Sequence, residues 1–299
     1  MSVFKHIGIV GRPDHEGVLE TLNRLLAYLA TKPVTIVLDH MTAGLLSAPA
    51  VETCGRRELS ARCDLVIVVG GDGSMLTMAK HIATDQVPVI GINRGKLGFL
   101  TDILPDEIEA KVDEVLAGKY EIESRFLLDA AREINGKREK LGSALNDVVL
   151  HPGQAAQMIE FELFINDRFV YSQESDGLIV ATPTGSTAYS LSAGGPIMHP
   201  NLNAIVLVPM YPHSLNSRPI VVDGDSEIRI VISPKCKLKP QVSCDGEEKY
   251  IASVGDEIIV TKKAVALKLI HTTQFSFYDA CRSKLGWGSR LGKAGVKAK

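Results

Sequence analysis

The chain has few of the features that mark specialised protein classes. Aromatic residues make up 5% of its 299 residues, and its five cysteines include no C-x-x-C pair, so neither a disulfide framework nor a zinc site is predicted. No stretch of about 18 apolar residues occurs, and the amino terminus lacks the apolar core of a signal peptide. The formal net charge of −2 provides no field that would attract nucleic acid. We therefore expect a cytoplasmic protein that binds neither membranes nor nucleic acid.

The apolar residues that are present follow two different patterns. Strand-like runs alternate with helical stretches in the first part of the chain, over residues 6–10, 18–30, 34–38, 65–69 and 87–92. This alternation predicts an α/β domain, a parallel sheet with helices on both faces. At about 150 residues per domain, the chain is long enough for a second domain.

The second pattern begins after Phe126, where short runs alternate between apolar and polar residues. We predict strands over 159–165, 204–208, 228–232, 241–244, 257–261 and 265–270, and hairpin turns at Asn166-Asp167, Asp223-Gly224 and Asp245-Gly246. A helix predicted over 278–285 should pack back on the first domain. The prediction is an α/β domain at 1–125, an all-β, sandwich-like domain at 126–275 and a returning segment at 276–299.

The most informative local feature is Gly70-Gly71-Asp72-Gly73, which ends an apolar β-branched run. A strand, a tight turn and a helix start at this place offer backbone amides and a partly positive helix terminus to an anion. Because a carboxylate repels phosphate, Asp72 needs another role, either to hold a cation or to accept a proton from a nucleophile. Asp72 is therefore the catalytic candidate. The alternative is a simple turn, in which Asp and Gly are common.

Two familiar phosphate-binding motifs do not fit this turn. A P-loop needs a lysine after its second glycine, and Gly73 is followed by Ser74 and Met75. The dinucleotide fingerprint needs a third glycine where this chain has Leu76. The predicted strand over 87–92 leads into a further polar loop, in which Arg94 and Lys96 are either phosphate contacts or solvated charges.

A second polar constellation lies in the second half of the chain. Residues 175–196 are rich in Ser, Thr and Gly, whose small side chains let a flat ligand lie close to the backbone. This composition favours a nucleotide-binding loop, although it also occurs in ordinary surface loops. Asn146 can offer a donor and an acceptor to an adenine edge, and Asp147 suits ribose hydroxyls.

Together these motifs resemble the bacterial NAD kinase family. The resemblance runs nearly end to end and rests on Gly70-Gly71-Asp72-Gly73, Gly91-Ile92-Asn93 with Leu97-Gly98-Phe99-Leu100, Asn146-Asp147, residues 175–196 and Ser243-Cys244-Asp245-Gly246. It implies a phosphotransferase that moves the γ-phosphoryl group of ATP to the 2′-hydroxyl of the adenosine ribose of NAD, giving NADP. It also implies a divalent cation, Mg²⁺ in the first place, and a homodimer or homotetramer. Some members of the family use polyphosphate.

Residue by residue, the resemblance implies that Asp72 accepts the proton of the 2′-hydroxyl and that Gly73 lies beside the ribose. Asn146 would meet the adenine, Asp147 a ribose, and Asp176 the ligand of the facing subunit. The adenosine pocket would be lined by Thr187, Ala188, Tyr189, Ser190, Leu191 and Ser192.

Two further positions, Gln157 and Glu174, vary within the family and are expected to tune contact with the substrate. Glu174 is negative where relatives can carry a cation, so we hypothesise that it favours the cationic ring of NAD over NADH. Glu174→Arg should then lower the ratio of kcat/KM for NAD to kcat/KM for NADH. Steady-state kinetics with both substrates tests this, and an unchanged ratio would contradict it.

Other classes of protein remain as alternatives. A non-catalytic NAD-binding sensor would need no base, which makes the Asp72 carboxylate superfluous. An NAD-dependent oxidoreductase would need the missing dinucleotide fingerprint. A related kinase that acts on another hydroxyl also fits, because lipid kinases and phosphofructokinases share the first motif.

Overall fold

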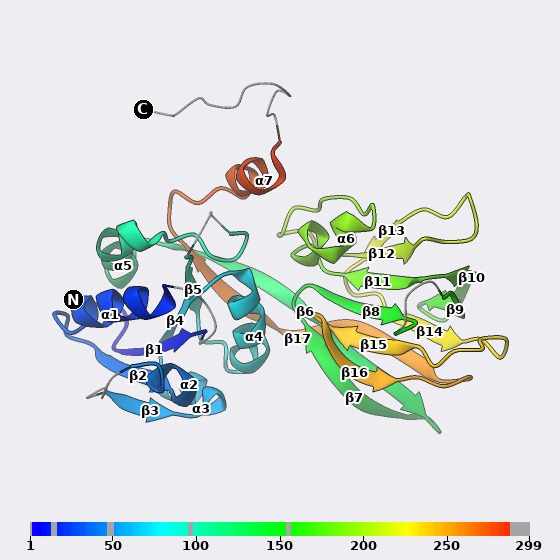
Figure 1. Ribbon diagram of the computed structural model, residues 1–299, viewed down its shortest axis with the longest axis horizontal. Helices are drawn as coiled ribbons and strands as arrows, with labels where there is room; N and C mark the ends of the chain where they lie inside the picture. Colours follow the sequence, from blue (N-terminus) through cyan, green and yellow to red (C-terminus); the bar gives the residue numbers. More distant parts are fainter. Residues whose placement is uncertain (1, 13–16, 47–50, 95–97, 154–156, 288–299) are drawn as a thin grey trace. The chain divides into compact units, whose positions relative to one another are not determined.

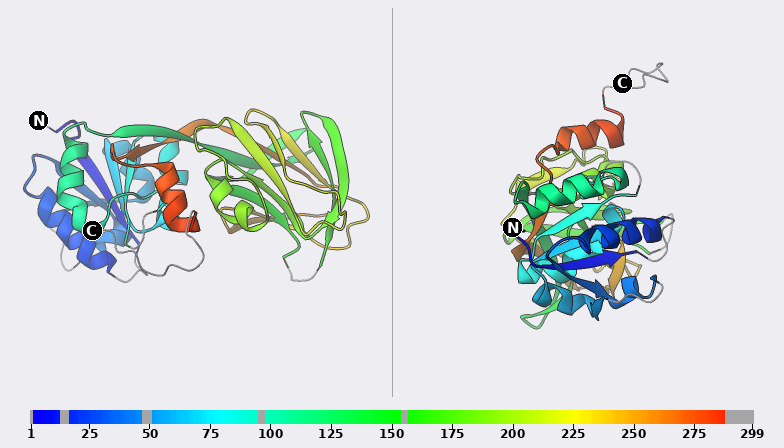
Figure 2. Two further views of the ribbon diagram at one scale, coloured as in Figure 1. Left: turned by 90° about the horizontal axis from the view of Figure 1, so that it is seen from above. Right: turned by 90° about the vertical axis from the view of Figure 1, so that its left-hand side faces the viewer.

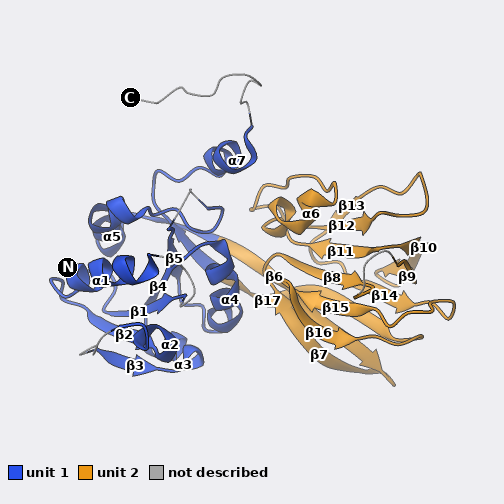
Figure 3. Cartoon of the chain, viewed as in Figure 1, with its two compact units in different colours: residues 1–123, 268–299 blue, residues 124–267 orange. Residues whose placement is uncertain are grey.

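The computed structural model describes residues 2–12, 17–46, 51–94, 98–153 and 157–287. The chain divides into two compact units, residues 1–123 with 268–299 and residues 124–267 (Figure 3). The chain passes from one unit to the other twice, each time within a long strand, β6 (Glu121–Ile134) and β17 (Glu257–His271). The second change comes earlier than the boundary at 275/276 proposed from the sequence, because the end of β17 is already a strand of the first unit. Within the described ranges, no helix has the length and apolar character needed to cross a membrane.

The first unit is built on a parallel sheet with the strand order β17-β5-β4-β1-β2-β3 (Figure 1). All five residues of β4 are buried, as expected for a strand covered by helices on both faces. Its elements are β1 (His6–Gly11), α1 (Val18–Leu29), β2 (Thr35–Asp39), α2 (His40–Ala43), β3 (Glu52–Cys54), α3 (Arg56–Arg62), β4 (Leu65–Val69), α4 (Asp72–Ile82), η1 (Ala83–Asp85), β5 (Val89–Ile92), η2 (Pro105–Glu107), α5 (Ile108–Leu116) and α7 (Phe277–Leu285).

Helices cover both faces of this sheet, as the sequence pattern predicts (Figure 2). Val18, Leu22, Leu25 and Leu29 form the buried side of α1 and share a core cluster with residues of β1, β4 and α5. On the other face, α3 packs so closely that a side chain in place of Gly8 would collide with Leu59.

The predicted C-terminal helix is α7, which belongs to the first unit. Phe277, Ala280 and Cys281 are its buried residues. The ring of Phe277 lies 6.1 Å from that of Phe99, between ring centroids. The expectation that this helix returns to the first domain is therefore confirmed.

The second unit contains two antiparallel sheets, β10-β9-β14-β17 with the β6-β7 hairpin, and β13-β12-β11-β8-β15-β16. One apolar cluster joins their inner faces, with Phe161 and Ile230 from the first sheet and Val148 and Leu178 from the second. The sandwich-like prediction is confirmed. The remaining elements are β7 (Lys137–Ala144), β8 (Asp147–His151), β9 (Ile159–Ile165), β10 (Arg168–Ser175), β11 (Gly177–Ala181), η3 (Gly185–Thr187), α6 (Tyr189–Ser192), β12 (Ala204–Met210), β13 (Ile220–Asp223), β14 (Ile228–Ile232), β15 (Gln241–Cys244) and β16 (Glu247–Ile251).

Two predicted hairpin turns are confirmed and one is wrong. Asn166-Asp167 and Asp245-Gly246 join antiparallel neighbours, and all four residues have positive φ angles. Asp223-Gly224 instead leads from β13, which pairs with β12, to β14, which pairs with β9 and β17 in the other sheet.

The strands predicted over 257–261 and 265–270 form one continuous strand, β17. The polar residues between them do not end it, because their long side chains reach partners. Lys262 Nζ lies 3.0 Å from Asp225 Oδ1, and Lys263 Nζ lies 3.3 Å from Ser143 Oγ.

Candidate active site

The Gly-Gly-Asp-Gly motif forms the connection between β4 and α4, at the carboxyl end of the parallel strands. The Gly70 N–H donates a hydrogen bond of 2.9 Å to the Ile92 carbonyl of β5. Helix α4 begins at Asp72, directly after Gly71. The first amides of α4 and the carboxyl edge of the sheet together form the position at which open α/β sheets bind ligands.

The Asp72 carboxylate is held by the loop that follows β5. Oδ2 accepts the Phe99 N–H at 3.1 Å, and Oδ1 accepts the Leu100 N–H at 3.1 Å and the Thr101 hydroxyl at 3.2 Å. This close approach requires glycine at Gly98, because a side chain there would collide with Asp72 Oδ1 and Thr101 Oγ1. The loop therefore fixes the position of the carboxylate.

These contacts leave the carboxylate with capacity for a substrate hydroxyl. A carboxylate offers about four acceptor positions. The described residues use three of them, two on Oδ1. With respect to the described residues, Oδ2 can accept one further hydrogen bond, and Asp72 is half-buried, so a carboxylate in this position is chemically able to orient a hydroxyl group and to take its proton.

A cavity of about 230 Å³ lies beside the motif. It includes Ser74 and Thr77 of α4, Arg12 after β1, and Arg56. Arg56 Nε donates to the buried Asp39 carboxylate at 2.8 Å, whereas Arg12 is exposed and lies next to Gly73. Arg12 is thus a cation that can contact a phosphate bound at the turn.

Of the two predicted phosphate contacts, Arg94 and Lys96, only Arg94 lies among the described residues. Arg94 is directed towards α1, where Nη1 lies 3.0 Å from Thr21 Oγ1 and 4.0 Å from Glu20 Oε2. Lys96, with the rest of 95–97, lies outside the described residues.

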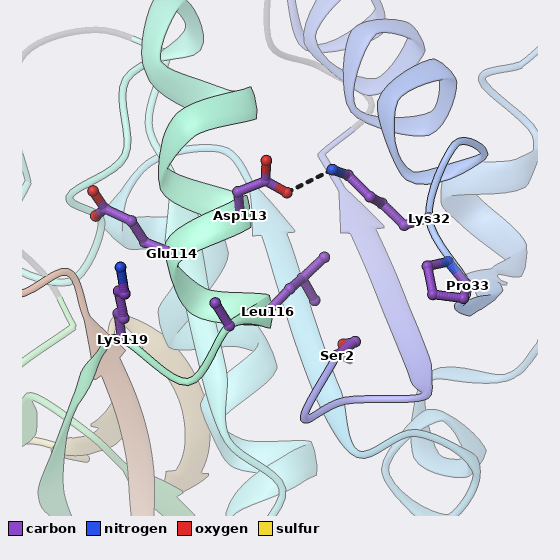
Figure 4. Close-up of a pocket in the computed structure, with 8 residues that line it drawn as sticks. Ser2, Lys32, Pro33, Asp113, Glu114, Leu116 and Lys119 are labelled. Atoms are coloured by element: carbon purple, nitrogen blue, oxygen red, sulfur yellow. Dashed lines mark ion pairs between the residues drawn. The ribbon is translucent and has the colours of Figure 1, made fainter.

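A cavity of about 490 Å³ lies elsewhere in the first unit (Figure 4). Its lining includes Ser2 before β1, Lys32 and Pro33 before β2, and the end of α5, where Asp113 Oδ1 lies 2.7 Å from Lys32 Nζ. These residues precede the strands, so the cavity is at the amino edge of the sheet. Open α/β sheets bind ligands at the other edge, which makes this cavity a weak candidate.

In the second unit, the predicted nucleotide-binding residues lie on and around two antiparallel neighbours, β8 and β11, with Asp147 paired to Ala181 at one end and Asp176 before Gly177 at the other. Asp147 is buried at the start of β8, directly after Asn146. Burial raises the pKa of Tyr189, and the negative charges of Asp147 and Asp176 raise it further. Asp147 and Asp176 therefore each lie within electrostatic range of Tyr189.

The other predicted pocket residues lie in two short helices after β11. Thr187 is in η3, Ala188 joins the two helices, and Ser190, Leu191 and Ser192 are in α6. Ser190 is fully buried, whereas Tyr189 is 47% exposed. Ser190 is therefore inaccessible in this structure, whereas the Tyr189 ring is available to a ligand.

Sequence reasoning missed part of this site. A cavity of about 370 Å³ is lined by Tyr189 and Ser192 and also by residues between Pro209 and Pro219. The positive φ of 43° at Tyr211 turns the chain here, and the Tyr211 ring is 81% exposed. The only signal for this segment in the sequence is an aromatic residue, Tyr211, among prolines.

Gln157 and Glu174 lie at the open end of the β9-β10 hairpin, and both are exposed. The Glu174 carbonyl accepts the His213 N–H at 3.0 Å, which places Glu174 next to the 209–219 segment. The structure thus brings Glu174 near the candidate pocket, whereas no described contact ties Gln157 to it.

Comparison with known proteins assigns both units. The model of the ATP-NAD kinase N-terminal domain matches residues 7–120, and the model of the ATP-NAD kinase C-terminal domain matches residues 145–272. The chain belongs to the NAD kinase family. An NAD kinase of Pseudomonas paraeruginosa is 57% identical over 292 residues, which cover 98% of this chain and 99% of that protein.

Solved structures of NAD kinase relatives agree with this assignment. The crystal structure of yeast NADH kinase complexed with NADH superposes with a TM-score of 0.88 at 28% identity, covering 97% of this chain and 90% of that chain. An NAD kinase from Archaeoglobus fulgidus in complex with ATP gives a TM-score of 0.70 at 25% identity, with coverage of 90% and 94%. The family resemblance and the fold class predicted from the sequence are confirmed.

Proposed function

We propose that the chain transfers the γ-phosphoryl group of ATP to the 2′-hydroxyl of the adenosine ribose of NAD, giving NADP, with Asp72 as the general base. Family membership supports the activity. The observation that supports the role of Asp72 is its carboxylate, held by the 98–101 loop with one acceptor position on Oδ2 that no described residue uses.

The proposed chemistry requires little from the protein beyond positioning. Phosphoryl transfer passes through a loose transition state, in which the nucleophile needs orientation and the phosphoryl oxygens need positive charge. A carboxylate is too weak a base to ionise a sugar hydroxyl in advance, so Asp72 orients the hydroxyl and accepts its proton late. The amides at the start of α4 and the guanidinium of Arg12 supply positive charge to the phosphates.

We also propose a divalent cation, with Mg²⁺ in the first place. The described residues contain no group of three or more His, Cys, Asp or Glu side chains arranged to hold a metal ion. Mg²⁺ usually keeps several waters and binds through one or two carboxylates together with substrate phosphates, so the phosphates of ATP can supply most of its ligands. The residues therefore fit a cation that arrives with ATP and neutralises charge on its phosphates.

In the second unit, we propose that Asn146 meets the adenine of NAD and Asp147 a ribose, with Tyr189 beside the adenosine. Asp176 would contact the ligand of a facing subunit in a homodimer or homotetramer. The exposed Tyr211 and Leu215, at 81% and 91%, provide apolar surface for such an assembly. A molar mass of one chain in light scattering would contradict the oligomer.

The five buried cysteines fit a cytoplasmic protein.

The test of the function is NADP formation by the purified protein with ATP and Mg²⁺. A sensor would bind NAD in calorimetry without forming NADP. A kinase for another hydroxyl would consume ATP only when a different acceptor is present. Formation of NADP that requires both NAD and ATP would exclude both alternatives.

A further inference from the structure

The turn aspartate Asp245 has contacts that a turn does not require. Its carboxylate accepts three successive backbone N–H groups, from Leu145 at 3.0 Å, Asn146 at 2.8 Å and Asp147 at 3.3 Å. The Asp245 N–H donates in return to the Asp147 carbonyl at 3.0 Å. A residue about a hundred positions along the chain thus holds the backbone that carries the two proposed NAD contacts.

Thr182 holds the same segment, residues 145–147, by donating to two of its backbone carbonyls. Its N–H donates to the Asn146 carbonyl at 2.9 Å, and its hydroxyl donates to the Leu145 carbonyl at 2.6 Å. Gly185 lies so close that a side chain there would collide with the Asn146 carbonyl. All six backbone polar groups of residues 145–147 are therefore satisfied, three of them by one carboxylate.

We propose that Asp245 is a positioning residue for the kinase reaction, which sets the places of the Asn146 and Asp147 side chains against NAD. The inference rests on the proposed function, because it takes these two residues as substrate contacts. Hydrogen bonds from backbone amides to a carboxylate are stronger than those to a neutral acceptor, so one side chain can hold the segment in a single position.

The chain contains a matched control in its other Asp-Gly turn. Within the described part of the chain, the Asp223 carboxylate accepts one backbone N–H, that of Asp225, two residues along the chain, at 2.8 Å from Oδ1. Asp223 is exposed at the end of β13 and has no part in the proposed site. The same dipeptide thus serves a local turn at one place and a distant segment at the other.

The experiment compares Asp245→Asn with Asp223→Asn. We expect Asp245→Asn to raise KM and the calorimetric Kd for NAD by about 10-fold to 100-fold, because an amide cannot accept all three N–H groups as well as the carboxylate does. The KM for ATP should change less than about threefold, since the ATP contacts are proposed elsewhere. Asp223→Asn should leave all these values unchanged. An unchanged affinity for NAD in Asp245→Asn would overturn the inference.

A double-variant cycle separates positioning from general destabilisation. If Asp245 acts through Asn146 and Asp147, Asp245→Asn should weaken NAD binding much less in the Asn146→Ala/Asp147→Asn background than in the wild type. An equal fold-change in both backgrounds would contradict the proposal. If Asp245→Asn fails to fold, Asp245→Glu keeps the carboxylate but displaces it by one methylene, and the same cycle applies. If the wild type forms no NADP, the proposed function is wrong, but the role of Asp245 is still tested, because calorimetry measures whether Asp245→Asn weakens NAD binding.

Discussion

Asp72→Asn should lower kcat by about 100-fold to 10,000-fold while leaving the affinity for NAD within a few-fold of the wild-type value. The amide keeps the shape of the side chain and one acceptor oxygen, but it cannot take the proton of the 2′-hydroxyl. Steady-state kinetics gives kcat, and calorimetry gives the Kd for NAD. The effect should appear in kcat because the proton is transferred only in the transition state.

Thr101→Val is the control for the structural part of this effect. It removes the hydroxyl that donates to Asp72 Oδ1 at 3.2 Å but keeps the carboxylate and the two amide contacts. Loss of one hydrogen bond to a charged group costs about 1.5–3 kcal/mol and leaves the base itself in place, so Thr101→Val should retain more activity than Asp72→Asn. Equal losses in the two variants would assign Asp72 to holding the loop. Loss of NAD binding in Asp72→Asn, with turnover preserved at saturation, would assign it to substrate recognition.

Local sequence was sufficient for the turn that carries Asp72, but not for its partners. The apolar run at 65–69 and the glycines after it predict both β4 and the start of α4, because burial and backbone freedom are properties of these residues themselves. The groups that hold the carboxylate are backbone amides of Phe99 and Leu100. Every residue except proline has such an amide, so no side-chain pattern indicates which ones will meet Asp72.

The two Asp-Gly turns show the same limit in another form. Asp223-Gly224 and Asp245-Gly246 are identical as dipeptides, and both were predicted as hairpin turns. Only the second joins paired strands, and only its carboxylate reaches residues 145–147. The difference depends on which sheet the next strand joins, which is decided by packing across the whole unit rather than by the turn.

A second large effect is expected at a buried ion-paired histidine in the first unit. His271 lies at the end of β17 with its ring stacked on Phe275, at 3.8 Å between centroids. Its Nδ1 lies 3.6 Å from Asp102 Oδ2, and its Nε2 lies 3.5 Å from Glu123 Oε2. Burial lowers the pKa of His271, but the two carboxylates outweigh burial and raise its pKa above the ordinary value.

Asp102→Ala should lower the free energy of unfolding by about 3–5 kcal/mol, because it removes one of the two carboxylates that face the buried His271 and leaves Glu123 alone to balance its charge. The variant also removes the acceptor of the Thr272 N–H, which donates to Asp102 Oδ2 at 2.8 Å. Urea unfolding measures the overall effect, and faster hydrogen exchange of the Thr272 amide reports the local one. Asp102→Asn keeps an oxygen for this amide and should cost less. A loss below about 1 kcal/mol in Asp102→Ala would contradict the assignment.

The same ion pair predicts how stability depends on pH. Because the pKa of His271 is higher in the folded protein than in the unfolded chain, the stabilisation is complete below the unfolded value of about 6.5. It is lost as pH rises through the folded value, where the imidazolium gives up its proton and the attraction to Asp102 and Glu123 disappears. Unfolding free energies measured from about pH 6 to about pH 9 should therefore fall more steeply for wild type than for His271→Gln. Parallel curves for the two proteins would show that folding does not shift the pKa of His271.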